Sequence, residues 1–257
     1  MENGWSLKKL HRVILLSNTY RQSSDSQADA VAADPDNTWL WRYSRRRMEA
    51  EAIRDSMLSV SGLLNAKMGG PGVFPPVPSG VLTELSATAA AGGWKTEKDP
   101  AQSNRRSVYI FVRRNLRYPM LQEFDSANTF ESAHLRTNTV TPAQSLDLLN
   151  NDLVLDWARA FAGRVLNDRD PTPDASGQVD RAFRLAFGRK ATADDQKMAA
   201  AFLERQAPIM TARLTEGGKA APPMPTRTPE GMNPARAAAF VDLCQMLLTS
   251  NEFLYIN

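Results

Sequence analysis

Helix-boundary signals in residues 141–257 restrict the fold of this chain more than any other feature of the sequence. The run Thr141-Pro142-Ala143-Gln144 combines a capping box with proline at the first helical position, so a helix is predicted to begin there. Apolar residues at helical spacing follow it, and a second helix is predicted with Val154, Trp157, Ala158, Phe161 and Val165 on one face.

The same signals continue toward the C-terminus. Gly188 is placed as a C-cap, and Thr192 with Asp195 resembles the cap of the next helix, so a helical hairpin is predicted. A final helix is predicted over 235–248. Its pattern VDLCQMLL contains Cys244, the single cysteine, which we predict to be a buried thiol. One cysteine excludes an internal disulfide and a Cys-rich zinc site.

Two helices are predicted in the N-terminal part. The segment SLKKLHRVILLSN places Leu7, Leu10 and Ile14 on one face, with Ser6 as the N-cap. Residues 23–33 are predicted to be a loop, and residues 34–37 a turn or cap. A long helix is then predicted over 38–65, because apolar residues recur at spacings of four, three and four, at Ile53, Met57, Val60 and Leu64.

The middle of the chain contains most of its helix breakers. Residues 68–104 include GGPGVFPPVPSG and AGGW, which predict a long irregular segment, and residues 116–140 are also predicted to be irregular. Residues 105–115 favour a short strand, with a buried helix as the alternative. The expected fold class is therefore mainly α, a multi-helix globular domain over 1–257 with long irregular segments and a short β element.

Composition agrees with a folded domain of this size. The chain has 257 residues, 42% hydrophobic and 23% charged, which is ordinary for a globular protein. No stretch approaches the roughly 18 apolar residues that span a bilayer. Lys8 and Lys9 precede the apolar run 13–16, but that run is too short for the core of a signal peptide, so none is predicted.

Arginine dominates the basic side chains, with 23 arginines among the 31 basic residues. This bias is compatible with binding of a polyanion, but we favour the codon usage of a GC-rich genome as its origin. Residues 101–140 hold six basic and three acidic side chains and form the most electropositive region, with Arg105, Arg106, Arg113, Arg114 and Arg117 interleaved with Tyr109, Phe111 and Tyr118. Because Val108, Ile110 and Val112 indicate a buried segment, a nucleic-acid surface is disfavoured.

Five motifs occur in a fixed order along the chain. They are WSLKKLHRVILLSNTYRQSS, DPDNTWLWRYSRRRMEAEAIRDSML, RRSVYIFVRRN with a following FD, the run Arg136-Thr-Asn-Thr with PAQSLDLLN, and the terminal SNEFLYIN. This series resembles the exported bacterial family called domain of unknown function 1553, the C-terminal module of large planctomycete-type proteins. The resemblance covers nearly the whole chain.

The resemblance implies a setting and not a reaction. In such proteins the module follows other domains, often a cytochrome-c-like haem domain and sometimes carbohydrate-binding modules, behind a signal peptide. The implied partners are thus upstream or separately encoded domains, and the implied location is exported, periplasmic or at the cell surface. This chain contains no C-x-x-C-H motif, so haem is expected on a partner domain and no cofactor in this chain. We therefore expect this chain to be either the terminal portion of a longer protein or a separately encoded remnant of one.

One group of residues suggests catalysis. His134 lies near Asp125 and Arg136 in an irregular segment, where Asp125 could orient the imidazole as a general base and Arg136 could hold an anionic substrate group. The favoured alternative is that Asp125 and His134 each bond to local backbone. The other histidine, His11, is expected on a helix surface or at the edge of the core. Motifs for nucleophilic catalysis, nucleotide binding or a metal site are absent from the sequence.

Carbohydrate binding is the other possibility. Trp39, Trp41 and Tyr43, together with Arg105 and Arg106, are candidate substrate-binding residues, although the aromatic residues are expected to anchor the long helix in the core.

Two acidic residues on the same predicted helix are a candidate carboxylate pair for glycoside hydrolysis. Glu49 and Glu51 are two positions apart, which would point them away from each other. Arg45 with Glu49 and Arg47 with Glu51 would instead form pairs at i, i+4.

Two functions remain open from the sequence. The first is an accessory or scaffold module that binds a ligand within an exported cytochrome-linked or polysaccharide-processing system, with no catalytic activity of its own. The alternative is a hydrolase that acts on a carbohydrate or anionic substrate through Asp125, His134 and Arg136.

Overall fold

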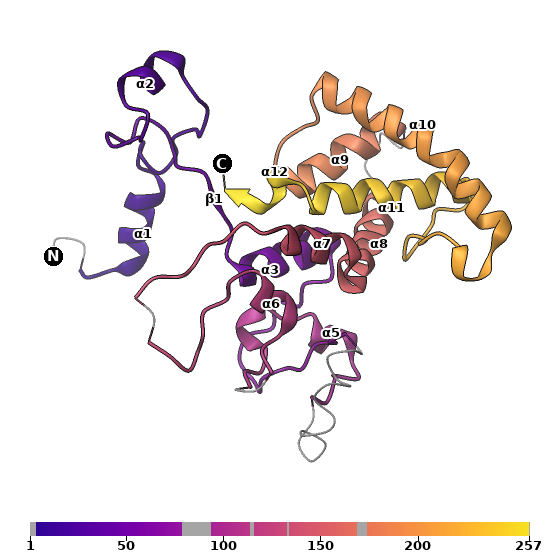
Figure 1. Ribbon diagram of the computed structural model, residues 1–257, viewed down its shortest axis with the longest axis horizontal. Helices are drawn as coiled ribbons and strands as arrows, with labels where there is room; N and C mark the ends of the chain where they lie inside the picture. The colour runs from indigo at the N-terminus through magenta and orange to yellow at the C-terminus, as the bar shows by residue number, and fades with distance from the viewer. Residues whose placement is uncertain (1–3, 79–93, 114–115, 133, 169–173, 257) are drawn as a thin grey trace. The chain divides into compact units, whose positions relative to one another are not determined.

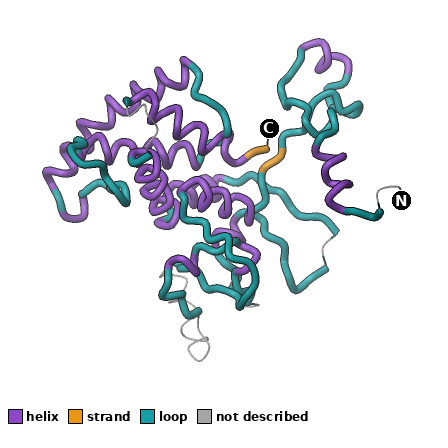
Figure 2. The backbone as a smooth tube through the Cα atoms, turned by 180° about the vertical axis from the view of Figure 1, so that it is seen from behind, coloured by secondary structure: helices purple, strands orange, loops and turns teal. Residues whose placement is uncertain are grey.

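A computed structural model describes residues 4–78, 94–113, 116–132, 134–168 and 174–256. The chain divides into a smaller unit, residues 1–48 with 255–257, and a larger unit, residues 49–254. Helices predominate in the described residues, as Figures 1 and 2 show, so the predicted mainly α fold class is confirmed.

Two apolar helices form the core of the larger unit. α8 (Asp152–Leu166) and α11 (Pro234–Leu248) are buried along most of their length and pack against each other. α3 (Ala50–Ser61) packs against α8, and both α9 (Ala175–Phe187) and α10 (Ala193–Glu216) pack against α11. Small side chains allow α11 to approach its neighbours closely, since four of its buried residues are alanines: Ala235, Ala237, Ala238 and Ala239.

The predicted helix boundaries in this half are confirmed. Thr141 accepts a hydrogen bond from the Gln144 backbone and the Gln144 side chain accepts one from the Thr141 backbone, which closes the capping box of α7 (Pro142–Asn150). Gly188 ends α9 at φ +71°, a conformation that glycine adopts without strain. Cys244 is completely buried in α11, as predicted.

Shorter helices connect these elements. They are α5 (Pro100–Ser103), η1 (Ser107–Tyr109), α6 (Pro119–Glu123), η2 (Gly218–Ala220) and α12 (Asn251–Leu254). α6 corrects the prediction that residues 116–140 are irregular throughout. Pro119 occupies its first turn, where a missing N–H costs nothing.

In its described residues, 4–48 and 255–256, the smaller unit contains two helices and a two-stranded β-sheet. α1 (Leu7–Leu15) begins at the predicted cap, with the Ser6 side chain accepting from the Lys9 backbone at 3.4 Å. α2 (Ala28–Ala33) was predicted to be loop; its sequence ADAVAA is rich in alanine, the strongest helix former. β1 (Arg46–Arg47) pairs antiparallel with β2 (Tyr255–Ile256).

The prediction of a helix over 38–65 was wrong at its N-terminal side, because the helix begins only at Ala50. The Asp34 carboxylate accepts hydrogen bonds from the backbones of Thr38 and Trp39, and Leu40 adopts φ +55°. These features hold the backbone in turns, which a helix cannot accommodate. The expected i, i+4 geometry of Arg45 with Glu49 and Arg47 with Glu51 is therefore absent. At the other end Gly62, at φ +78°, stops α3.

The predicted strand over 105–115 was also wrong in the residues that the structure describes. η1 occupies its centre, and Ile110 forms only an isolated bridge with Val73. Ile110 is buried as expected, whereas Val108 and Val112 are 73% and 50% exposed. A single 3-10 turn directs neighbouring side chains differently from a strand, so the apolar run is not buried as one face.

The breaker-rich segment is irregular where it is described. Residues 68–78 and 94–104 contain no regular element except α5. Residues 79–93 of the predicted irregular segment lie outside the described residues. Within the described ranges, no helix combines the length and the apolar character needed to cross a membrane.

Two buried arginines connect the irregular middle to the helices. Arg54 of α3 is 1% exposed and donates to the carbonyl oxygens of Ser103 and Arg105 and to the Ser107 hydroxyl, at 2.7–3.2 Å. Arg105 is equally buried and donates to the carbonyl oxygens of Lys67, Gly69 and Pro71. Its guanidinium also lies 3.8 Å from the centre of the Tyr109 ring.

Replacing Arg54 by methionine is expected to destabilise the larger unit by about 3 kcal/mol, because the substitution leaves buried carbonyl groups without donors. Urea denaturation, followed by circular dichroism, measures the loss. Arg205→Met, at an exposed position of α10, is the matched control and should stay within about 0.5 kcal/mol of the parent. If Arg54→Met and Arg205→Met unfolded at the same urea concentration, the structural role of Arg54 would be contradicted.

Candidate functional site

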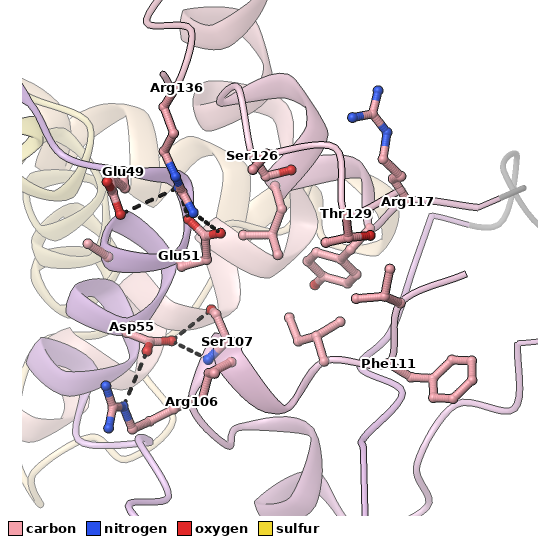
Figure 3. A pocket seen from close by; sticks show the side chains of 17 residues that line it. Glu49, Glu51, Asp55, Arg106, Ser107, Phe111, Arg117, Ser126, Thr129 and Arg136 are labelled. Carbon is pink, nitrogen blue, oxygen red and sulfur yellow. Dashed lines mark hydrogen bonds and ion pairs between the residues drawn. The ribbon is translucent and has the colours of Figure 1, made fainter. Parts of the chain in front are cut away.

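The larger unit contains a pocket of about 500 Å³ between α3 and the irregular middle of the chain (Figure 3). This volume is typical of a small-molecule site. α3 and its cap contribute one wall, and residues 106–112 contribute another. The remaining lining residues come from the neighbourhood of α6 and from the segment after it: Arg117, Tyr118, Leu121, Ser126, Ala127, Thr129 and Arg136.

A cluster of charges forms the polar wall of the pocket. Arg136 donates to both carboxylate oxygens of Glu51, from Nη1 at 2.7 Å and from Nη2 at 3.0 Å. Its Nη1 also lies 3.4 Å from a carboxylate oxygen of Glu49. Figure 3 shows the guanidinium between the two carboxylates. An arginine from one irregular segment thus joins two acidic residues at the start of α3.

This convergence corrects the prediction that Glu49 and Glu51 point away from each other. Glu49 is the N-cap of α3, with extended backbone at φ −67° and ψ 151°, and only Glu51 belongs to the helix. The helical spacing rule therefore does not apply to the pair. Glu51 lies in the first turn, where the helix dipole stabilises a negative charge.

A second polar contact lies one turn further along α3. The Asp55 carboxylate accepts hydrogen bonds from the backbone N–H and the hydroxyl of Ser107, both at 2.7 Å. Arg106 approaches the other oxygen of Asp55 at 3.8 Å. These bonds hold residues 106–107 against α3 and so fix the distance between the two walls of the pocket.

The second wall is largely apolar. Val108, Ile110, Phe111 and Val112 line the pocket, and Phe111 is 45% exposed. One face of the Phe111 ring stacks on Phe74, with ring centres 4.8 Å apart. Phe111 therefore lies at the outer edge of the pocket, and Figure 3 shows its ring directed away from Glu51 and Arg136.

The ionic contacts change the acidity of one pocket carboxyl. The hydrogen bonds from Arg136 lower the pKa of Glu51, and partial burial opposes this effect without reversing it. Glu51 is consequently a carboxylate throughout the neutral range. Burial raises the pKa of the Tyr118 hydroxyl, so this phenol stays protonated there.

The structure brings one of the three predicted catalytic residues into the pocket. Arg136 lines it, whereas both carboxylate oxygens of Asp125 accept hydrogen bonds from Thr139, at 2.8–2.9 Å. Asp125 adopts φ +61° in the turn after α6, and its bonds close the base of the segment that carries Arg136. His134 is exposed and does not line this pocket.

The aromatic candidates belong to the smaller unit. Trp39 is 77% exposed, so the expectation that it anchors a helix in the core was wrong. Trp41 is half-buried, and its indole N–H donates to the carbonyl of Asp34 at 2.9 Å. The guanidinium of Arg42 lies 4.8 Å from the Trp41 ring centre. Tyr43 is also half-buried. The turn around Asp34 and Asn37, and not a helix, positions these side chains.

Neighbouring arginines of the electropositive region differ in environment. Arg105 is buried in backbone contacts, so it does not offer a binding surface, while Arg106 has a side chain that is 54% exposed and lines the pocket. Arg117 also lines the pocket. Arg114 lies outside the described residues. The described part of the chain holds no group of three or more His, Cys, Asp or Glu side chains arranged for a metal ion.

The chain belongs to the PSD1 family, described as a protein of unknown function (DUF1553), whose model matches residues 1–203. This match confirms the family resemblance, and it covers the first four of the five sequence motifs; the terminal SNEFLYIN lies outside the matched residues. No curated protein and no solved structure matches the chain.

Sequence reasoning selected Arg136 but missed its partners. Glu49 and Glu51 were dismissed because a helix was assumed over both, and Asp55 and Ser107 were not singled out. No local signal marks these partners, because Arg136 is 85 positions from Glu51 and Ser107 is 52 positions from Asp55.

Glu51→Gln is expected to lower the free energy of unfolding by about 1 kcal/mol at pH 7, because it removes the charge of a half-exposed ion pair. Since the folded state lowers the pKa of Glu51, its stabilising contribution is present above the unfolded-state pKa and is lost as the pH falls through the folded-state pKa. The difference between the parent and the variant should therefore disappear under strongly acidic conditions.

Urea titrations at a series of pH values measure this difference. Glu131→Gln, in the exposed part of the same segment, is the matched control and should leave the pH dependence unchanged. A difference between parent and Glu51→Gln that stays constant down to strong acid would show that the ion pair does not stabilise the fold.

Proposed function

We propose that this chain is an accessory module that binds a carbohydrate in the pocket between α3 and residues 106–112, and that it serves an exported cytochrome-linked or polysaccharide-processing system. One observation carries the proposal: the cluster of Glu49, Glu51 and Arg136 faces a pocket that also has an aromatic edge. Planar charged groups beside an aromatic ring are suited to a sugar, which presents hydroxyl groups around its rim and apolar C–H groups on its faces.

The charged cluster retains hydrogen-bonding capacity for a ligand. Glu51 occupies one N–H on each terminal nitrogen of Arg136, and among the described residues the Nε–H of Arg136 has no bonded partner. The free edge formed by Nε and Nη2 can donate two parallel hydrogen bonds to neighbouring sugar oxygens. Glu49 has a side chain that is 64% exposed, and it can accept from a sugar hydroxyl.

Other groups in the lining suit a polyhydroxylated ligand. Ser126 and Thr129 offer hydroxyls from the segment that follows α6. These groups donate and accept, as sugar hydroxyls do, so they can match several ligand orientations. The net charge of the lining is zero, since three acidic residues are balanced by Arg106, Arg117 and Arg136. The pocket therefore has no net charge that would favour a charged ligand over a neutral sugar.

Binding without hydrolysis is favoured by the state of Glu51. A glycosidase needs one carboxyl with a raised pKa that can protonate the leaving group. Arg136 lowers the pKa of Glu51 instead, which removes it as a general acid. Hydrolysis through Asp125, His134 and Arg136 receives less support, because Asp125 is bonded to Thr139 and only Arg136 lines the pocket. Any haem of the system would be bound by a partner domain.

Glycan-array screening followed by titration calorimetry tests the proposal on the full chain. Glu49→Gln is expected to weaken binding of the selected oligosaccharide about tenfold, through loss of a charged acceptor. Phe111→Leu keeps an apolar side chain but removes the aromatic face, and should weaken binding about fivefold.

Phe130→Leu is the matched control, because Phe130 is also half exposed but does not line the pocket. It should bind as the parent does. If no oligosaccharide bound, or if Glu49→Gln and Phe111→Leu bound as tightly as Phe130→Leu, the pocket would not be a carbohydrate site.

A further inference from the structure

α1 exposes an apolar face that nothing in the described part of the smaller unit covers. None of its residues is buried, and Leu7, Leu10, Val13 and Ile14 are between 47% and 69% exposed. At 100° per residue these four side chains occupy about a third of the helix circumference. Trp5, 79% exposed, precedes the helix, and Tyr20, 52% exposed, follows it.

The charged side chains of α1 itself are all basic, and the nearest acidic residues in the sequence are Glu2 and Asp25. Residues 4–24 contain Lys8, Lys9, Arg12 and Arg21 and no Asp or Glu. Lys8, Lys9 and Arg12 are exposed and lie on the part of α1 away from its apolar face. Lys8, Lys9 and Arg12 give α1 a local positive charge, which favours a negatively charged counterpart.

The small size of the apolar face of α1 favours a membrane surface over a protein as its binding partner. A stable protein–protein interface buries about 800 Å² on each partner and takes about 20–30 residues a side. α1 has nine residues and offers four apolar side chains on one face. A short amphipathic helix with basic residues and flanking aromatic side chains suits the boundary between lipid headgroups and acyl chains, where the contact is shallow and needs no matching shape.

We propose that α1 binds anionic membrane surfaces, lying in the plane of the interface. Leu7, Leu10 and Ile14 enter the acyl region, while Lys8, Lys9 and Arg12 contact headgroup phosphates. Either contribution alone is weak, since one short apolar face or a few basic residues gives only marginal attachment. The two together give reversible, salt-sensitive binding. This inference is independent of the carbohydrate pocket.

Co-sedimentation of the full chain with vesicles tests the proposal. Vesicles of equal parts phosphatidylglycerol and phosphatidylcholine should bind the chain, and vesicles of phosphatidylcholine alone should bind it about tenfold more weakly. Leu10→Asp should weaken binding to the anionic vesicles about tenfold or more, because the substitution places a charge on the face that enters the acyl region. Lys8→Glu with Lys9→Glu should produce a similar loss.

Leu146→Asp is the matched control, because Leu146 is 58% exposed on α7 of the larger unit, and it should leave binding unchanged. Since Leu10 is itself exposed, circular dichroism should show the same fold for both variants. Absence of binding to anionic vesicles would overturn the proposal. Equal binding by the parent and Leu10→Asp would also overturn it, because the apolar face of α1 would then contribute nothing to vesicle binding. Binding to heparin without binding to vesicles would assign α1 to an acidic polymer instead.

Discussion

The buried guanidinium of Arg54 is the contact on which the arrangement of the larger unit depends. A charge can remain in a protein interior only where hydrogen-bond acceptors surround it. Arg54 obtains its acceptors from Ser103, Arg105 and Ser107, some fifty residues further along the chain. The segment that contains α5 and η1 is thereby bound to α3 by side-chain hydrogen bonds, because its own backbone hydrogen bonds are mostly local turns.

The pocket is a consequence of this attachment. Ser107 contacts both Arg54 and Asp55, so the start of residues 106–112 is held against α3 by two neighbouring side chains. Arg136 brings a third segment to the same helix through Glu51. The start of α3, residues 106–112 and the segment that carries Arg136 thus meet at one place. The pocket between them has a lining of polar and apolar side chains, as small-ligand sites do.

The arginine content has a structural explanation that composition alone did not provide. Several arginines donate to backbone carbonyl groups in loops and at helix ends, where regular structure leaves acceptors unsatisfied. Arg164 of α8 donates to the last carbonyls of α3, at Ser59 and Val60, and Arg159 donates to Met224. The guanidinium group suits this task because it carries five donors and stays charged. Polyanion binding is therefore not needed to account for these residues.

The sequence by itself determined the helices of the C-terminal half, because the capping box at Thr141, the C-cap at Gly188 and the apolar periodicity of α8 and α11 depend on residues close together in the chain. It also identified the family. Only the tertiary structure decided where α3 starts, since Arg46–Arg47 are held as strand β1 against Tyr255–Ile256 just before the helix. The same is true of the pairing of Arg136 with Glu51 across 85 positions. Contacts between residues so far apart have no local spacing that could predict them, since they arise from how the segments pack.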